Sequence, residues 1–547
     1  MQRIQTLFLI ALGLCWTSSP SFAHFLWLVP QKDNGSEVHL YFSEGPEADN
    51  PKLLEKIADV PVTAYVSDKK GEPMSFAFSA DRQTLAAKHS GATAWKLQHT
   101  YGTHGRDVKN LIIYTAMSIP CGWNGMSAND RVSLPKEGFT ASVTCDAGQL
   151  KIALEQDGKP AAAIEFDFQA PNDHQTLTTD ATGTAVVDGI QPGVYAIRCL
   201  ESDPTPGTHN GTDYAGVNHY TTISFRVPDL TKVTPVGASD SKISELPEPV
   251  TSFGAATQGN YLYAYGGHTG SAHSYSNEEQ FNRLIRWDLS SSGQGNWEEL
   301  AEGPRVQGNA LIAAKNYVVL LGGFNAENAT GEKSRLVSQA GVKRYALDKK
   351  AWESLPDLPE PRSSMDAAIL GDTIYVVGGW SMNGNGSETK WLETAWKLTL
   401  RNDGTNSGWQ PIAPPPFKRR AMAVAAYDGK IFVIGGMNSD GGPTTACATY
   451  DPKTDQWSAI DSLAGVPMNG FGAAAQEVDG QLIATTEDGS IQRWNKDSQT
   501  WEIIGSTGTG RFFHRLLPIA NRRFVILGGA NMDIGKFSEC DVFAIAP

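Results

Sequence analysis

Eight of the eleven histidines lie in the first half of the chain: His24, His39, His89, His99, His104, His174, His209 and His219. His24 directly follows a small-residue cleavage signal, so the processed chain would present its α-amine beside its own imidazole. That pair is a chelate suited to copper or nickel, and it needs one or two further ligands. We expect His104 or His219, each in a turn-like stretch containing glycine, to complete the site, with Glu44 as a weaker oxygen ligand. The alternative is that His24 starts an ordinary strand and the other histidines are surface or core residues.

The second half carries cationic side chains at recurring positions: Arg305, Arg362, Arg419, Arg420, Arg511 and His514, with His268 on a neighbouring loop. Arginine suits bidentate contact with carboxylates. If the loops that carry these residues emerge on one face, they form a binding site for an anionic ligand. The alternative is that the arginines make structural hydrogen bonds within each repeat.

Signatures of common enzyme and metal sites are missing from the sequence. It contains no C-x-x-C, H-E-x-x-H or G-x-S-x-G spacing and no phosphate-binding loop. The motifs therefore favour binding over catalysis.

The first 23 residues have the pattern of a secretory signal. Arg3 supplies the positive charge, residues 7–16 form a short apolar run, and Ser21-Phe22-Ala23 provides small residues for cleavage. Cys15 raises a lipoprotein alternative, but the preceding Leu14 is too large for that signal. We therefore predict cleavage after Ala23 and a periplasmic or secreted protein.

Charge and hydropathy limit the partners. The chain has 45 basic and 59 acidic residues and a net charge of −14. This balance argues against a nonspecific grip on nucleic acid, which needs an excess of Lys and Arg. No later run is apolar enough to span a bilayer.

A repeat organises the second half. A double glycine closes an apolar strand at Gly266, Gly322, Gly378, Gly435 and Gly528, with first intervals of 56, 56 and 57 residues. The last interval is 93 residues and leaves room for a unit near residues 482–489 that has lost its glycines. Repeats of this length, with several strands each, are typical of propellers.

The repeat also contains an aromatic residue followed at seven residues by tryptophan, as in Tyr345 and Trp352 or Tyr450 and Trp457. These residues and spacings resemble the kelch repeat. Six blades are predicted, with second strands at residues 261–265, 317–321, 373–377, 430–434, 481–485 and 523–527. The sixth blade lacks its fourth strand at the C-terminus, and residues 243–247 are predicted to supply it, because an open sheet edge is a liability.

The first half has a different pattern. Residues 148–227 show alternating apolar positions broken by DG, TG and PG turns, which indicates a transthyretin-like or Ig-like β-sandwich. Strand-like runs also occur between residues 24 and 114. We therefore predict an all-β chain: a signal peptide (1–23), a β domain (24–147), a β-sandwich (148–230), a linker (231–242) and a six-bladed kelch propeller (243–547).

The first half also resembles a periplasmic family, domain of unknown function 4198. The resemblance rests on the segment 24–28 (HFLWL), the Ser43-Glu44 pair, the DGKP run at 157–160 and the closing Pro206-Gly207, Tyr214 and His219-Tyr220. It implies an association with nickel or cobalt uptake. Thr208 stands where an acidic residue is expected in that family.

The propeller resemblance brings two enzymes into view. Bacterial exported six-bladed kelch proteins include sialic acid mutarotases, so an arginine-lined mouth could act on an acidic sugar. Oxidases related to galactose oxidase share the propeller, but the chain ends where their following domain would begin. The favoured function is an exported envelope binding protein, with the propeller as a platform for a protein or glycan ligand and a metal-binding first module. The alternative is a mutarotase- or epimerase-like enzyme.

Five cysteines remain after cleavage: Cys121, Cys145, Cys199, Cys447 and Cys540. Cys447 and Cys540 occupy equivalent repeat positions two blades apart, too far for a disulfide. Any pair is expected among the other three, and the sequence leaves their pairing open.

Overall fold

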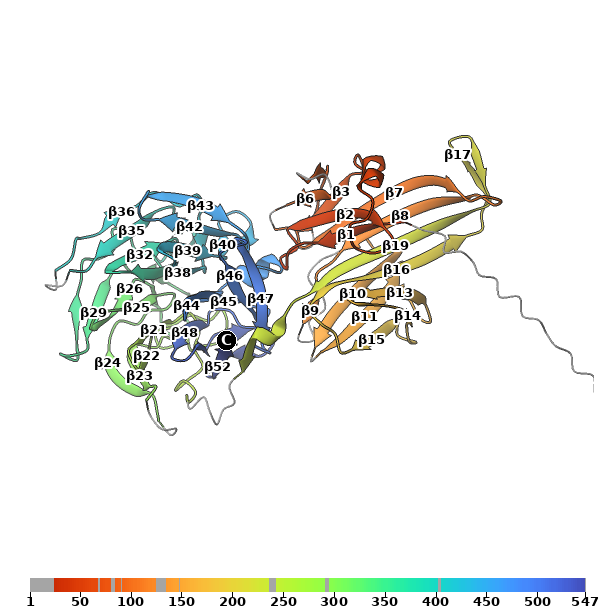
Figure 1. Ribbon diagram of the computed structural model, residues 1–547. Coiled ribbons are helices and arrows are strands. Elements are labelled where there is room, and N and C mark those ends of the chain that lie inside the picture. Colours follow the sequence, from red (N-terminus) through yellow and green to blue (C-terminus); the bar gives the residue numbers. More distant parts are fainter. Residues whose placement is uncertain are drawn as a thin grey trace, which may run out of the picture.

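The computed structural model describes residues 24–66, 69–79, 84–89, 91–123, 134–146, 148–235, 243–290, 295–401 and 405–546. The predicted signal peptide lies outside these ranges. The described chain is built almost entirely of strands, in an N-terminal module and a propeller that stand side by side (Figure 1). No helix among the described residues is long and apolar enough to cross a membrane.

The described part of the N-terminal module has three large sheets and a two-stranded sheet of β17 (Gly207–His209) and β18 (Thr212–Tyr214). The first contains β1 (Phe25–Pro30), β2 (Glu37–Ser43), β6 (Leu85–Lys88) and β5 (Ala77–Phe78), in that order. The second has eight strands, in the order β14 (Asp173–Thr178), β13 (Glu165–Ala170), β16 (Gly193–Asp203), β19 (Gly216–Val227), β8 (Asn110–Ser118), β7 (Ala94–His104), β3 (Val62–Val66) and β4 (Lys69–Met74). The third contains β12 (Lys159–Pro160), β11 (Gln149–Gln156), β10 (Phe139–Asp146) and β9 (Gly122–Trp123), with β15 (Thr184–Asp188) also paired to β11.

The eight-stranded sheet is shared by two hydrophobic cores. Ala116 and Ala196 on one face belong to the core under β1 and β2, whereas Met117 and Ile197 on the other face belong to the core under β10 and β11. Successive strand residues point to opposite faces, so one sheet serves both cores. The predicted boundary between residues 147 and 148 therefore does not divide the sheets. It is crossed by the parallel pairing of β8 with β19, which joins residues far apart in the sequence.

The propeller has six four-stranded blades, which confirms the predicted fold class. From the axis outward, the first five blades are β21 (Gly254–Gln258), β22 (Tyr261–Tyr265), β23 (Arg283–Asp288) and β24 (Glu298–Glu302); β25 (Ala310–Ala314), β26 (Tyr317–Leu321), β29 (Val342–Ala346) and β30 (Ala351–Ser354); β31 (Asp366–Leu370), β32 (Thr373–Val377), β35 (Ala395–Thr399) and β36 (Gln410–Pro411); β38 (Ala423–Tyr427), β39 (Lys430–Ile434), β42 (Cys447–Asp451) and β43 (Gln456–Ile460); and β44 (Ala474–Val478), β45 (Gln481–Thr485), β46 (Ser490–Asn495) and β47 (Thr500–Ser506).

The sixth blade contains β48 (Arg515–Ile519), β49 (Arg523–Leu527), β52 (Cys540–Ile545) and β20 (Val233–Pro235). Its outer strand is β20, which pairs antiparallel with β52 and closes the ring. The prediction that residues 243–247 form this strand is wrong, and the predicted linker 231–242 contains the closing strand. Leu246 instead packs between blades six and one, with its backbone N–H donating to the Ser538 carbonyl at 2.7 Å. Leu246 thus comes after the outer strand of blade six in the sequence, as Leu355 comes after the outer strand of blade two.

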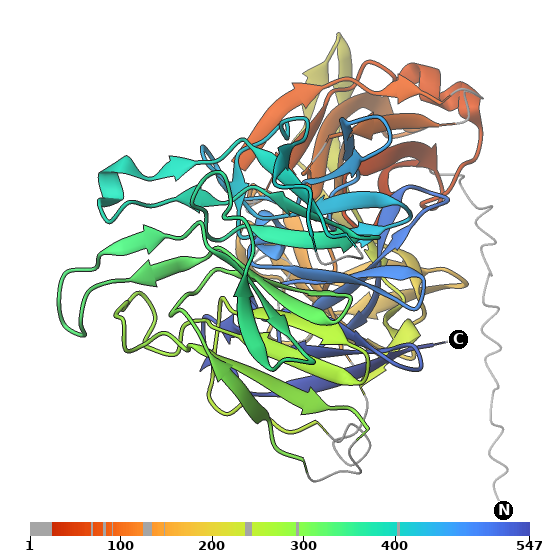
Figure 2. The ribbon, with the colours of Figure 1, turned by 90° about the vertical axis from the view of Figure 1, so that its left-hand side faces the viewer.

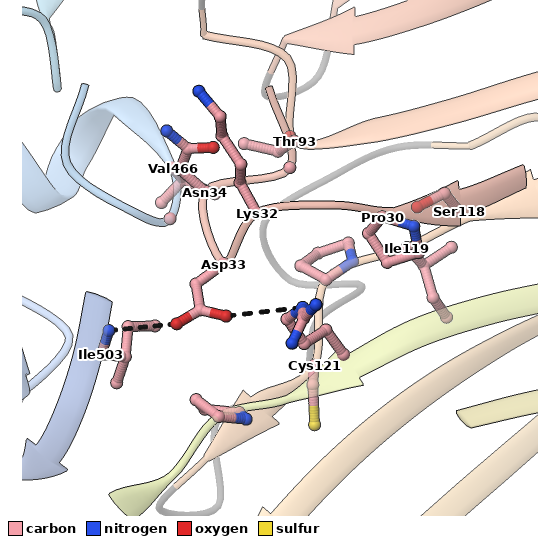
Figure 3. A pocket seen from close by; sticks show the side chains of 15 residues that line it. Pro30, Lys32, Asp33, Asn34, Thr93, Ser118, Ile119, Cys121, Val466 and Ile503 are labelled. Carbon is pink, nitrogen blue, oxygen red and sulfur yellow. Dashed lines mark hydrogen bonds and ion pairs between the residues drawn. The ribbon is translucent and has the colours of Figure 1, made fainter. Parts of the chain in front are cut away.

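The two modules meet at the turn between β1 and β2. Asp33 Oδ2 accepts a hydrogen bond from the Ile503 amide at 3.1 Å (Figure 3). Asn34 Nδ2 donates to the Ser462 carbonyl at 3.1 Å. Lys32 Nζ lies 3.4 Å from Asp461. Three consecutive side chains therefore bind the outer parts of blades four and five, which fixes the turn against the propeller.

Candidate functional site

A ring of backbone hydrogen bonds surrounds the propeller axis at one end. In each blade, the N–H of one residue just before or near the first strand donates to the carbonyl of its counterpart in the preceding blade, at 2.6–3.3 Å. The ring residues are Ser252, Gly308, Ser364, Ala421, Gly472 and Phe513, all with φ between 50° and 61°. A left-handed backbone is unfavourable for a bulky residue such as Phe513, so the ring must hold it there. The ring residues line a small cavity together with His514 and Arg515.

An ion pair crosses the axis next to the ring. Two residues after the ring, blades three and six carry Asp366 and Arg515, which approach to 3.2 Å across the axis. The four other blades have Gly or Ala at this position: Gly254, Ala310, Ala423 and Ala474. Arg515 also donates to the carbonyls of Phe253 and Asn309, and Asp366 accepts from the Val424 amide. Side chains thus fill the axis where the small residues would leave space.

His514, a predicted ligand residue, lies beside this ion pair and is 3% exposed. Its Nε2 is 2.6 Å from the Thr485 hydroxyl. Burial, aided by Arg511 and Arg515, lowers the pKa of His514 to about 3. The imidazole is therefore neutral at physiological pH and held within the core of the propeller.

Three of the predicted arginines are built into the blades. Arg362, Arg419 and Arg511 stand two residues before the ring, and each donates to the carbonyl that precedes its blade's third strand. Arg362 and Arg511 also donate to the first glycine carbonyl of the double glycine, at 3.3 Å in both cases. Arg305 similarly donates to the carbonyls of Asn277 and Gln280. These four guanidiniums hold backbone segments together, as the structural alternative expects.

Arg420 differs from the other four. Its guanidinium lies over the ring of Trp380, with the centroid at 4.1 Å, and near Trp391 at 5.6 Å. Its guanidinium donates a hydrogen bond to the Met437 sulfur at 2.9 Å, a weak acceptor, and its buried Nε has no hydrogen-bond partner in the described structure. Tyr275 is close enough to influence it electrostatically. Arg420 is therefore the one of these five arginines whose guanidinium makes no hydrogen bond to a backbone carbonyl in the described structure.

Aromatic and aliphatic side chains continue around the ring from Arg420. Phe471 and Phe512 occupy the equivalent positions, one residue before the ring, in blades five and six, and their ring centroids are 5.8 Å apart. Beyond them, Met532 and Ile534 form the tip of the β50–β51 hairpin (Ala530–Asn531 and Gly535–Lys536) and are 68% and 64% exposed. We call this region the mouth surface: Tyr275, Trp380, Trp391, Arg420, Phe471, Phe512, Met532 and Ile534.

Hairpins shape the mouth surface. Blades two and three raise β27–β28 (Phe324–Ala326 and Leu336–Ser338) and β33–β34 (Trp380–Ser381 and Lys390–Trp391), which stand out at the left of Figure 2. Blade five has only residues 486–489 between β45 and β46. Blade five therefore raises no hairpin beside Phe471 and Phe512, and the rim of the mouth surface is lowest there.

His268 also lies on this side of the propeller, but both its ring nitrogens are engaged. Nε2 is 2.7 Å from the Ser274 carbonyl and Nδ1 is 3.1 Å from Lys536 Nζ. Burial lowers the pKa of His268, and it also lowers the pKa of Lys536, to about 8. The pair links the loop of blade one to the hairpin of blade six.

The predicted metal ligands are not brought together. His24 Nε2 is 3.1 Å from Asp49, whereas His219 Nε2 is 2.8 Å from the Thr115 hydroxyl. His219 and Tyr220 are successive residues of β19, so their side chains point to opposite faces of the sheet. Tyr220 contacts Phe25, and the ring of His219 therefore lies on the other face. His104 pairs with Asn110 at the far end of β7, and Glu44 lies at a cleft with Arg198. The described residues contain no group of three or more His, Cys, Asp or Glu side chains arranged to hold a metal ion.

Comparison with known proteins identifies the repeat. Residues 252–486 match the family described as the KLHDC2/KLHL20/DRC7 Kelch-repeats domain. The C-terminal half therefore contains a kelch-repeat domain.

Similar proteins include Beta-scruin of Limulus polyphemus, 29% identical over 30% of this chain and 17% of that protein. Kelch-like protein 15 of Mus musculus is 25% identical over 43% of this chain and 40% of its own length. The chain thus spans less than half the length of these relatives. A solved structure titled "Structure of YjhT" aligns with 55% of this chain and 96% of its own, at 16% identity and a TM-score of 0.43.

Sequence reasoning missed most of the mouth surface. The predicted site residues do not include Trp380, Trp391, Phe471, Phe512, Met532 or Ile534. One signal was present: Trp380 directly follows a double glycine, outside the periodic aromatic positions. Arg419 stands two residues before the ring residue Ala421 and Arg420 one residue before it, and this difference decides their contacts. The sequence alone does not show where the ring lies.

Proposed function

We propose that this protein is an exported binding protein whose mouth surface recognises a polypeptide carrying a carboxylate beside apolar side chains. The observation that carries the proposal is Arg420, whose guanidinium rests on Trp380 and makes no hydrogen bond to a backbone carbonyl in the described structure. An arginine held in this way can make strong hydrogen bonds to an approaching carboxylate. Kelch domains bind proteins, which agrees with this use of the propeller.

Exposed apolar side chains favour a polypeptide over a glycan. Met532 and Ile534 stand in solvent at a hairpin tip, and aliphatic side chains of this kind fit apolar protein groups. A glycan would use the tryptophans for stacking and would leave these two residues without a role. The proposal therefore names a polypeptide, with a glycan as the other outcome of the test.

The enzyme alternative needs a free acid–base pair beside the arginine. His268 and His514 are the predicted histidines nearest the mouth, and the first is engaged at both nitrogens while the second is buried against Thr485. An enzyme acting on an acidic sugar would have to use other groups. Nuclear magnetic resonance exchange between the anomers of N-acetylneuraminate tests this directly, and acceleration by the protein would favour the enzyme.

A displayed library of random peptides provides the binding test. Panning against the chain that starts at His24 should enrich peptides with an acidic residue next to aromatic or aliphatic ones. These peptides should be lost with Arg420→Met or Trp391→Ala and kept with Arg401→Met. Arg401 is the matched control, because it is exposed and follows β35 on the opposite face of the propeller. Enrichment that is indifferent to Arg420, or binding only to a panel of glycans, would contradict the proposal.

Export and the role of the first module remain part of the proposal. The signal-like residues 1–23 support secretion or a periplasmic location. Copper or nickel binding at His24 would rest on its amine, its ring and the neighbouring Asp49. A form with Met-Ala before His24 has no free amine at that position, so equal copper affinity of the two forms would exclude the chelate.

A further inference from the structure

Two cysteines lie on neighbouring strands of the third sheet in the N-terminal module. β9 runs parallel to β10, with Gly122 opposite Thr144 and Trp123 opposite Cys145. Cys121 directly precedes β9. Because residues alternate between faces, Cys121 lies on the same face as Val143 and Cys145. Both cysteines are buried in the same core, at 5% and 6% exposure.

The two cysteines are free thiols in one core, one directly before β9 and the other on the neighbouring β10. The Cys121 thiol donates to the Gly122 carbonyl at 3.4 Å. The amide and the thiol of Cys145 are both near enough to affect the pKa of Cys121, which agrees with the placement of the two residues on one face. The Ile119 amide donates to the Ser224 carbonyl at 3.0 Å, whereas Pro120 and Cys121 lie outside the strands. Gly122 follows Cys121, so small backbone adjustments are available there.

Cys199 shares the core but is placed differently. It lies on β16 in the eight-stranded sheet, opposite Thr221. Burial raises the pKa of its thiol to about 12, and no other thiol contributes to that shift. In the propeller, Cys447 and Cys540 begin the third strands of blades four and six, with blade five between them.

We propose that Cys121 and Cys145 form a disulfide in the exported protein, leaving Cys199, Cys447 and Cys540 as thiols. Each of the two thiols loses a proton and the pair loses two electrons as the S–S bond forms. A disulfide oxidant, either glutathione disulfide or an oxidised thiol–disulfide oxidoreductase, accepts them and becomes two thiols. Oxidising compartments outside the cytosol allow such bonds to persist.

The disulfide would strengthen the junction between the modules. Ile119, Pro120 and Cys121 line the pocket beneath Asp33, together with Arg226, and Figure 3 shows Cys121 at this place. The new bond would join this segment to β10 and close the loop formed by residues 121–145. A cross-link that closes a loop restricts the unfolded chain and so stabilises the folded one.

Peptide mapping without reduction tests the proposal on the full mature chain. Protein purified from an exporting host, and a second sample held with excess glutathione disulfide, are denatured, alkylated and digested. We expect a peptide joining Cys121 to Cys145 and three alkylated cysteines. Five alkylated cysteines in both samples, or a cross-link that includes Cys199, would overturn the proposal.

Variants make the assignment specific. Cys199→Ala should keep the cross-link and leave two thiols, whereas Cys121→Ala and Cys145→Ala should each leave four. The melting temperature of wild-type protein should fall on reduction, and that of the Cys145→Ala variant should not. An equal fall in both would show that the reductant acts elsewhere, and the Cys121–Cys145 bond would be rejected.

Discussion

At the propeller axis, Arg515 is paired with Asp366 and donates to two backbone carbonyls, whereas Arg420 on the mouth surface rests on two tryptophans with its Nε unpartnered. The axis uses charged side chains to complete the fold. The mouth surface holds one such side chain on aromatic rings beside exposed apolar groups. The position of a residue relative to the backbone ring therefore separates the arginines that hold backbone carbonyls from the one that we propose as the ligand contact.

The largest expected effect comes from breaking the axial ion pair. Arg515→Leu leaves the Asp366 carboxylate, which is 8% exposed as a residue, without its cation. Removing one partner of a buried ion pair costs about 3 kcal/mol. Urea unfolding measures the change, and adding Asp366→Leu should recover part of it. A loss below about 0.5 kcal/mol in the single variant would mean that the pair does not support the axis.

A smaller effect is expected at the arginines that hold the blades. Arg362→Met removes hydrogen bonds to the carbonyls of Gly378 and Thr394 in a site with no exposed surface. Unsatisfied buried acceptors make a loss of about 2 kcal/mol the expected result. Arg420→Met should change the free energy of unfolding by less than about 0.5 kcal/mol. Equal losses in the two variants would remove the distinction between structural and available arginines.

The pH dependence of stability tests His514. Its pKa is about 3 in the folded protein and about 6.5 in an unfolded chain, so only the unfolded state takes up the proton between these values. Its contribution to stability is therefore complete above pH 6.5 and falls as the pH decreases toward 3, by about 1.4 kcal/mol per pH unit. Comparison of wild type with His514→Gln over pH 5–7 isolates this slope. Parallel curves would show that His514 is protonated in the folded state.

The repeat made the propeller predictable, and its absence limited predictions for the first half. The six predicted second strands coincide with β22, β26, β32, β39, β45 and β49. Five of them end at a double glycine, which is a local signal, and β45 was predicted from the length of the last interval. The closing strand was missed because β20 has only three residues and carries no repeat pattern. In the N-terminal module, the parallel pairing of β8 with β19 depends on contacts about a hundred residues apart, which alternation alone does not reveal.

The candidate site was predictable only as a set of arginines. Their side-chain types and recurrence were visible, but Arg419 and Arg420 are adjacent and have different roles. Arg419 donates to the Ala446 carbonyl at 2.7 Å, whereas Arg420 points to Trp380. The backbone ring, made by six residues of unrelated types, decides this difference, and its left-handed φ values leave no common sequence signal.

The most direct test of recognition at the mouth surface is the affinity of one selected peptide for wild type, Arg420→Met and Arg401→Met, measured by fluorescence anisotropy. Each variant's melting temperature is recorded alongside. We predict a dissociation constant at least about tenfold higher for Arg420→Met, because a charge-assisted hydrogen bond is lost, with no change for Arg401→Met and an unchanged melting temperature for both. Equal affinities for all three proteins would contradict the account.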